Sequence, residues 1–125
     1  MTVPSELSGV WRGAVAEYVT AIAWMPKQVA LFVATGAGEI QRIDPLTGTT
    51  QTLQLPQDRS IDCLAVSPDG QFLAAGGQEG TVQVWRLVGA IAELVTTLEH
   101  PGTWVDQLAW SGTGNHLAFN LGRYV

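Results

Sequence analysis

Apolar and β-branched runs alternate with turn residues most clearly between Ile61 and Leu87. The runs are residues 61–67, 72–75 and 81–87, and the segments between them are Ser67-Pro68-Asp69-Gly70 and residues 76–80, GGQEG. Proline fixes the first corner of a turn and glycine adopts positive φ without strain, so the chain is expected to reverse direction at both segments. The pattern predicts an antiparallel meander.

The same pattern recurs along the chain. A shift of 42 positions places residues 19–44 on residues 61–86 without a gap, and a third copy begins 44 positions further on, at Val105. A stretch after each third strand, residues 49–55 and then 92–98, alternates polar and apolar as an edge strand does. An amphipathic helix over residues 90–98 is the competing interpretation, and the β-branched equivalent stretch argues against it.

A period in the low forties with several turn-separated strands is typical of a propeller array. We therefore expect an all-β fold: four-stranded antiparallel meander blades of a β-propeller, in an incomplete ring of about two and a half blades. Because complete propellers have about four to eight blades, we expect either the front of a longer protein or a ring closed by several copies. The expected segments of residues 1–125 are a closing strand at 9–16, blade 1 at 19–55, blade 2 at 61–98 and the first half of blade 3 at 105–125.

Charge and cysteine content narrow the function classes. Six basic residues against eleven acidic ones give a net charge of −5, and the basic residues are scattered singly. Nucleic acid and anionic membranes are therefore not expected as partners. Cys63 is the single cysteine, so no intrachain disulfide is expected, and a small buried residue is favoured over a reactive thiol. With no secretory leader and no long apolar span expected, the chain is predicted to be soluble and cytoplasmic.

Motifs in the middle repeat resemble those of the WD-repeat β-propellers. They are residues 64–70 (LAVSPDG), 73–77 (LAAGG) and 79–85 (EGTVQVW), with residues 100–105 (HPGTWV) similar to the lead-in to a next blade. The resemblance covers about residues 19–125, with degenerate repeats of a bacterial type. The dipeptide that names the family reads Trp85-Arg86 here, and His100 lacks the acceptor expected near Arg123. The resemblance thus implies blades held by apolar packing more than by buried polar links.

Candidate catalytic groups are sparse. The glycines in residues 112–117 lack the Gly-x-Gly-x-x-Gly spacing of a phosphate loop and favour a hairpin turn. His100 and His116 are not at metal-ligand spacing with any cysteine. Ser67, Ser111 and Asp69 lie in expected turns without a neighbouring base. No catalytic residue, cofactor or metal is therefore predicted.

Surface residues at the blade ends are the remaining candidates. Loops that lead into the first strands and turns that join second and third strands lie on one rim of a meander propeller, and the resemblance implies that partners bind there. The candidates are Tyr18, Thr20, Ser60, Asp62, Gln78, Glu79, Trp104 and Asp106. An aromatic in a loop with proline and glycine can anchor a partner, but packing of Trp104 over the blade end is the favoured interpretation. The core is expected to contain Trp24, Trp85 and Trp110.

The sequence leaves three functions open. The first is a non-catalytic protein-interaction scaffold of WD-repeat type, not an enzyme, which binds protein or peptide partners through its rim without a cofactor. The second is part of a propeller hydrolase or lactonase-type enzyme whose catalytic groups lie in other blades. The third is a structural fragment without a binding role. Open blade edges and an uncovered apolar face also predict self-association.

Overall fold

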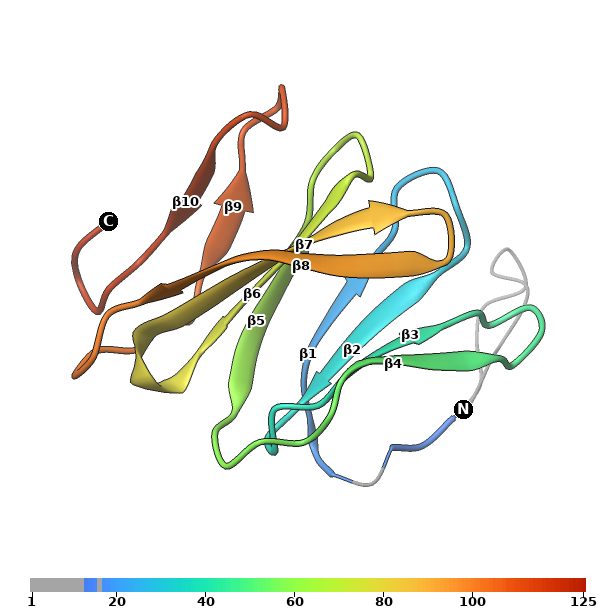
Figure 1. Ribbon diagram of the computed structural model, residues 1–125, viewed down its shortest axis with the longest axis horizontal. Helices are drawn as coiled ribbons and strands as arrows, with labels where there is room; N and C mark the ends of the chain where they lie inside the picture. Colours follow the sequence, from blue (N-terminus) through green and yellow to red (C-terminus); the bar gives the residue numbers. More distant parts are fainter. Residues whose placement is uncertain (1–12, 16) are drawn as a thin grey trace, which may run out of the picture.

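Three antiparallel sheets follow one another along the chain in the computed structural model, which describes residues 13–15 and 17–125 (Figure 1). The first sheet contains β1 (Val19–Trp24), β2 (Leu31–Thr35), β3 (Ile40–Ile43) and β4 (Thr50–Gln54). The second contains β5 (Ile61–Val66), β6 (Phe72–Gly77), β7 (Thr81–Val88) and β8 (Ile91–Glu99), with a short 3₁₀ turn, η1 (Gln78–Gly80), before β7. The third pairs β9 (Leu108–Trp110) with β10 (Leu117–Phe119).

The strands of each sheet pair in chain order, so both larger sheets are simple meanders. The prediction of four-stranded antiparallel blades in an incomplete ring is confirmed, since the described sheets form an open row (Figure 1). Of the predicted closing strand at residues 9–16, residues 9–12 and 16 lie outside the described residues. Gly13–Val15 are described and belong to no strand.

The turn from β5 to β6 depends on a left-handed glycine and on side-chain hydrogen bonds. Gly70 has a φ of 74°, in the left-handed region that favours glycine. The Ser67 hydroxyl donates to Asp69 Oδ1 at 2.6 Å, and the Gln71 backbone N–H donates to the same oxygen at 3.0 Å. These two hydrogen bonds, first that from Ser67, lower the pKa of Asp69. Hydrogen bonds from within the turn itself therefore close it.

Two apolar clusters join the three sheets. The first lies between the first and second sheets and contains Phe32, Ala34, Leu73, Ala75 and Trp85, all almost fully buried. The second lies between the second and third sheets, where Ala74 and Val82 pack against Val105. Each sheet is too thin to bury its own apolar residues, so face-to-face packing supplies the core.

The three tryptophans expected in the core have different environments. Trp85 is 3% exposed, as predicted. The Trp110 ring stacks on Phe72 with centroids 5.9 Å apart, and its indole N–H donates to the Ala65 carbonyl at 3.0 Å. The prediction for Trp24 is wrong, because its side chain is 59% exposed. It lies on the face of the first sheet opposite to Ala21, which packs toward the second sheet, and no described sheet covers that face.

The last strand of the second sheet decides between the two interpretations of residues 90–98. β8 pairs with β7 as an antiparallel strand, so the helical alternative is wrong. Its register shifts between Val84, which faces Thr96, and Trp85, which faces Leu94. Val95 is therefore the extra residue of a β-bulge, and it shifts the two-residue alternation of apolar side chains along β8 by one position. The apolar spacing along β8 therefore resembles that of a helix.

The third repeat begins its strand later than the sequence predicts. Residues 105–107 match the start of β5 in sequence, yet β9 starts at Leu108. The Val105 backbone N–H donates to Gly77 of the second sheet at 3.0 Å, and the backbone N–H groups of Asp106 and Gln107 donate to the Asn120 side chain. Because these three N–H groups already have acceptors, they are not available for backbone hydrogen bonds to β10.

Candidate binding rim

The loops before β1, β5 and β9 and the turns after β2 and β6 lie along one edge of the row of sheets, the lower edge in Figure 1. Backbone hydrogen bonds connect each loop to a turn. Gly36 donates to Tyr18 at 3.0 Å, Gln78 to Ser60 at 3.2 Å and Val105 to Gly77 at 3.0 Å. We call this edge the rim, and the eight residues predicted from the sequence lie on or beside it.

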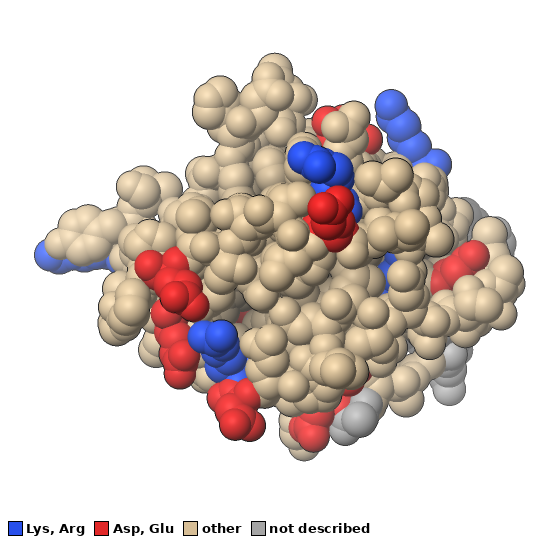
Figure 2. All heavy atoms as spheres, viewed as in Figure 1, with Lys and Arg blue, Asp and Glu red and all other residues tan. Residues whose placement is uncertain are grey.

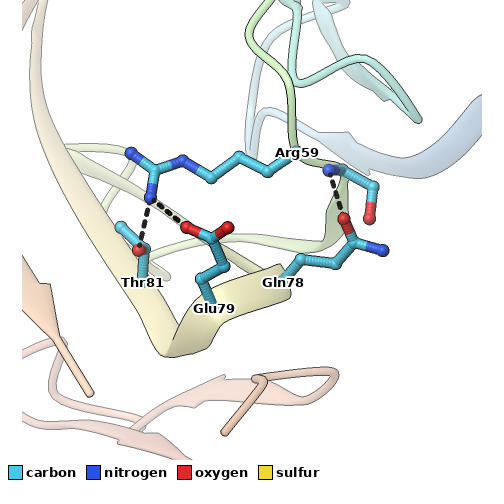
Figure 3. A network of polar contacts seen from close by, with 5 residues as sticks. Arg59, Gln78, Glu79 and Thr81 are labelled. Atoms are coloured by element: carbon cyan, nitrogen blue, oxygen red, sulfur yellow. Dashed lines mark hydrogen bonds and ion pairs between the residues drawn. The ribbon is translucent and has the colours of Figure 1, made fainter. Parts of the chain in front are cut away.

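A polar network fixes the part of the rim between β5 and β7 (Figure 3). The Arg59 guanidinium donates to Glu79 at 3.1 Å and to the Thr81 hydroxyl at 3.3 Å, and Gln78 accepts from the Ser60 backbone N–H at 3.2 Å. Because both side chains of the ion pair are solvent-accessible, it contributes at most about 1 kcal/mol to stability. The network therefore orients Gln78 and Glu79 more than it stabilises the fold.

The two aspartates that recur in register have different partners. Asp62 accepts from the Ser60 hydroxyl at 2.8 Å. Asp106 accepts from the Asn120 side-chain amide, whose oxygen accepts from the backbone N–H of Asp106 at 3.1 Å. Asn120 was missed by sequence reasoning, because the equivalent position in the second repeat is Gly76 and no repeated polar residue marks it. Both carboxylates are held in place at the rim.

Thr20 is occupied by contacts between sheets. Its hydroxyl lies within hydrogen-bond distance of the Ile61 carbonyl on β5 and of the Ala34 carbonyl at 3.3 Å. Ile61 begins the first strand of the neighbouring sheet, so this side chain links β1 to β5. Of the eight candidates, Thr20 therefore has the clearest structural role.

Two aromatic side chains project from the rim. Tyr18 is 87% exposed and Trp104 is 61% exposed, so the expectation that Trp104 packs over the blade end is wrong. The loop beneath Trp104 is nevertheless held on both sides, because the Thr103 hydroxyl donates to the His100 carbonyl at 2.7 Å and Val105 is fully buried. An exposed indole on a fixed loop has the properties of an interface anchor.

The chemistry of the other candidate groups is limited. His100 lies against Phe119, with ring centroids 5.7 Å apart, and its Nδ1 lies 3.3 Å from the Gly80 carbonyl, whereas His116 is exposed. Among residues 13–15 and 17–125, no three His, Cys, Asp or Glu side chains are grouped so as to hold a metal ion. Within the same ranges, no helix has the length and apolar content needed to cross a bilayer.

Cys63 lies beneath the rim in the second apolar cluster. The pKa of its thiol is raised to about 12, chiefly by burial and to a smaller extent by Asp62 and Asp106, against the lowering effect of the Gly76 backbone. We expect the native chain to react with iodoacetamide at pH 8 far more slowly than the urea-unfolded chain. The shift from 9.0 to about 12 corresponds to about a thousandfold less thiolate. Mass spectrometry of quenched samples measures the two rates, and equal rates would contradict the partly buried placement of Cys63.

Charge is dispersed over the molecule. Figure 2 shows a face that is mostly uncharged, with acidic and basic side chains interspersed. At the rim, Arg59 pairs with Glu79, while Asp62 and Asp106 face neutral donors. The described rim is therefore mildly acidic.

Comparisons with known proteins agree with this geometry. Residues 49–86 match the WD40 family, described as "WD domain, G-beta repeat". This chain carries a WD40 repeat. The match runs from the start of β4 in the first sheet into β7 of the second, so the sequence repeat of this WD40 chain is offset from its sheets by one strand.

Two solved structures show the same fold as this WD40 chain. The match to "Structure of U3-55K" covers 75% of the present chain and 30% of the solved chain, with a TM-score of 0.64 and 20% identity. The match to "Crystal structure of RRP9 WD40 repeats" covers 75% of the present chain and 29% of the solved chain, with a TM-score of 0.61 and 21% identity. Both cover under a third of the solved chain, as expected for sheets that form part of a ring.

Curated relatives are longer than this WD40 chain. The "THO complex subunit 6 homolog" of Rattus norvegicus is 32% identical over 118 residues, which cover 82% of this chain and 34% of the relative. "Actin-interacting protein 1" of Caenorhabditis elegans is 38% identical over 64 residues, 51% of this chain and 10% of the relative. "Probable cytosolic iron-sulfur protein assembly protein 1" of Cryptococcus neoformans is 38% identical over 66 residues, which cover 49% of this chain and 15% of the relative. These relatives do not support the bacterial type expected from the sequence.

Proposed function

We propose that this WD40 chain is a non-catalytic interaction scaffold that binds a protein or peptide through the rim. The observation that carries the proposal is the exposed indole of Trp104 on a loop held by Thr103 and Val105. A rigid aromatic side chain offers a large apolar contact area and loses little conformational entropy on binding.

The composition of the rim suggests the kind of partner. The carboxylates of Asp62 and Asp106 lie on the same rim as Trp104, and they accept hydrogen bonds from the neutral Ser60 and Asn120 side chains. A neutral or basic peptide segment with an apolar side chain for the indole would complement this surface. The names of the relatives agree with an interaction role, because one is a complex subunit and another an actin-interacting protein.

The proposal includes a cytoplasmic location, where a lone thiol such as Cys63 stays reduced. On the described residues, no specific observation favours the propeller-enzyme alternative over the scaffold.

Truncation of Trp104 tests the proposal. The full chain is immobilised, proteins retained from a cell extract are identified, and the same capture is made with Trp104→Ala. A partner bound at the rim should be retained by the wild type and lose at least about tenfold in affinity with the variant, because anchor residues contribute about 2 kcal/mol or more.

The control for this capture is Leu46→Ala. Leu46 is also an exposed apolar residue, and it lies in the turn between β3 and β4, outside the rim. This variant should retain the partner at the wild-type level. Equal retention by Trp104→Ala and by Tyr18→Ala, with circular dichroism unchanged, would contradict the rim as the binding surface.

A further inference from the structure

A groove lies between the first and second sheets, at the strand ends that face away from the rim. It has a volume of about 470 Å³, and its lining includes residues 28–30 of the β1–β2 turn, Arg42, Asp44 and residues 49–51 of the β3–β4 hairpin, and Ala90 of the β7–β8 turn. Figure 1 shows the β7–β8 turn beside the turn from β1 to β2. We call this hollow the inter-sheet groove. Both sheets that form it are complete four-stranded meanders.

The space between the second and third sheets shows what fills the equivalent place. The Trp110 ring stacks on the Phe72 ring with centroids 5.9 Å apart, and the Arg86 guanidinium carbon lies 5.9 Å from the Phe72 centroid. The Trp110 indole N–H donates to the Ala65 carbonyl at 3.0 Å. Two rings and a guanidinium therefore lie together between these two sheets.

The first and second sheets carry smaller side chains at the same repeat positions. A shift of 42 or 44 positions relates Phe72 to Ala30, Arg86 to Asp44 and Trp110 to Val66. Ala30 and Asp44 line the groove, whereas Val66 packs into the first apolar cluster. The groove therefore lies where the aromatic stack of the next interface is missing.

Arg42 spans the groove from the first sheet to the second. Its guanidinium donates to the Gly89 carbonyl at 2.9 Å and to the Gln28 side-chain oxygen at 3.3 Å, and it lies over the Phe32 ring, 5.9 Å from the centroid. Phe32 is fully buried beneath it. Because Arg42 also lines the groove, a second ring can stack on the side of the guanidinium that faces away from Phe32.

Asp44 supplies a hydrogen-bond acceptor on the same wall. One of its carboxylate oxygens accepts from the Leu46 backbone N–H at 2.8 Å, and its other oxygen has no hydrogen-bond partner among the described residues. The charges of Arg42 and Asp44 balance, so a charged side chain gains little in the groove. A neutral aromatic side chain that offers one N–H, as an indole does, complements the groove best.

We infer that the inter-sheet groove binds an indole side chain of a partner protein. The ring would rest on Ala30 and against the Arg42 guanidinium, with its N–H donating to the Asp44 carboxylate. This arrangement repeats the second interface, in which Trp110 stacks on Phe72 and donates to a fixed acceptor. The inference goes beyond the proposed function, because it does not involve the rim.

Titration of the ¹⁵N-labelled full chain with N-acetyltryptophanamide, an uncharged indole probe, tests this inference by NMR. Saturable shift changes are expected at the backbone amides of Ala30, Gln51 and Ala90, which line the groove, and none at Trp104 on the rim. The probe methylated at the indole nitrogen should bind about tenfold more weakly, because it cannot donate to Asp44. N-acetylleucinamide, which has neither ring nor donor, should bind more weakly still.

Gln51→Trp should lower the affinity for the probe at least about tenfold. Gln51 is exposed, pairs with Arg42 across the hairpin and lines the groove, so an indole attached there fills the space. Thr52→Trp is the matched control, because Thr52 is also exposed but, as the next residue of β4, points to the other face of the sheet. If Gln51→Trp does not fold, as judged by circular dichroism, Ala30→Phe takes its place, since it restores the ring of the second repeat.

Three results would overturn the inference. One is equal affinity for the tryptophan, methylated and leucine probes, which would make the groove a general apolar hollow. Another is equal binding by wild type, Gln51→Trp and Thr52→Trp, or shift changes outside the groove alone. The third is groove shifts that depend on protein concentration without a probe, which would identify a second copy of this chain as the occupant. Loss of a captured partner with Trp104→Ala concerns the rim only and leaves this test unaffected.

Discussion

Replacement of Trp85 by alanine is expected to lower the free energy of unfolding by about 3–5 kcal/mol. The side chain is 3% exposed, and it lies in the cluster that joins the first and second sheets beside Leu73 and Ala75. Its removal leaves a cavity in that cluster which rigid strands cannot fill. Urea unfolding monitored by circular dichroism measures the loss.

Trp104→Ala provides the comparison for this prediction. The same side chain is removed at a position that is 61% exposed, so the loss of stability should stay below about 1 kcal/mol. If both variants lost the same stability, the interface between the first and second sheets would not be the core of the fold.

The second large effect is expected for Gly80→Ala. Gly80 has a φ of 68°, and a Cβ there would lie 2.1 Å from the His100 carbonyl oxygen and 2.4 Å from the Thr103 hydroxyl. The His100 oxygen belongs to backbone, so it cannot rotate away. Strain and steric overlap together should reduce the free energy of unfolding by more than about 3 kcal/mol.

Gly89→Ala measures the cost of backbone strain in the absence of steric overlap. Gly89 has a similar φ of 59°, but nothing lies within 4 Å of the position of its Cβ. Only the backbone cost of about 1–2 kcal/mol should remain. Equal losses for the two variants in the same unfolding assay would show that the loop bearing Trp104 does not pack against Gly80.

The turn chemistry of the middle repeat made the fold predictable. Ser67-Pro68-Asp69-Gly70 closes through its own side chains, so a short sequence is enough to predict the reversal. The repeat then extended the prediction of strands to the copies with weaker turn motifs, and it favoured a strand over a helix for β8. Local hydrogen bonds and periodicity are properties of sequence, and both were visible in it.

The exposure of single residues was not predictable in the same way. Trp24 and Trp110 occupy equivalent positions in the repeat, but their burial depends on whether a sheet precedes them. Likewise, the side-chain link from Asn120 to Asp106 has no counterpart in the second repeat, because the position equivalent to Asn120 is Gly76. Periodicity gives the place of a residue within a sheet, whereas burial depends on the neighbouring sheet.

The central claim is that successive sheets stack face to face in the register of the repeat. Nuclear Overhauser effects between the rings of Phe72 and Trp110 test it most directly, since these residues belong to different sheets and their centroids lie 5.9 Å apart. We expect cross-peaks between the two rings and slow exchange of the Trp110 indole proton, which is bound to Ala65. Cross-peaks from Trp110 to its own segment alone, with a rapidly exchanging indole proton, would contradict the stacked arrangement.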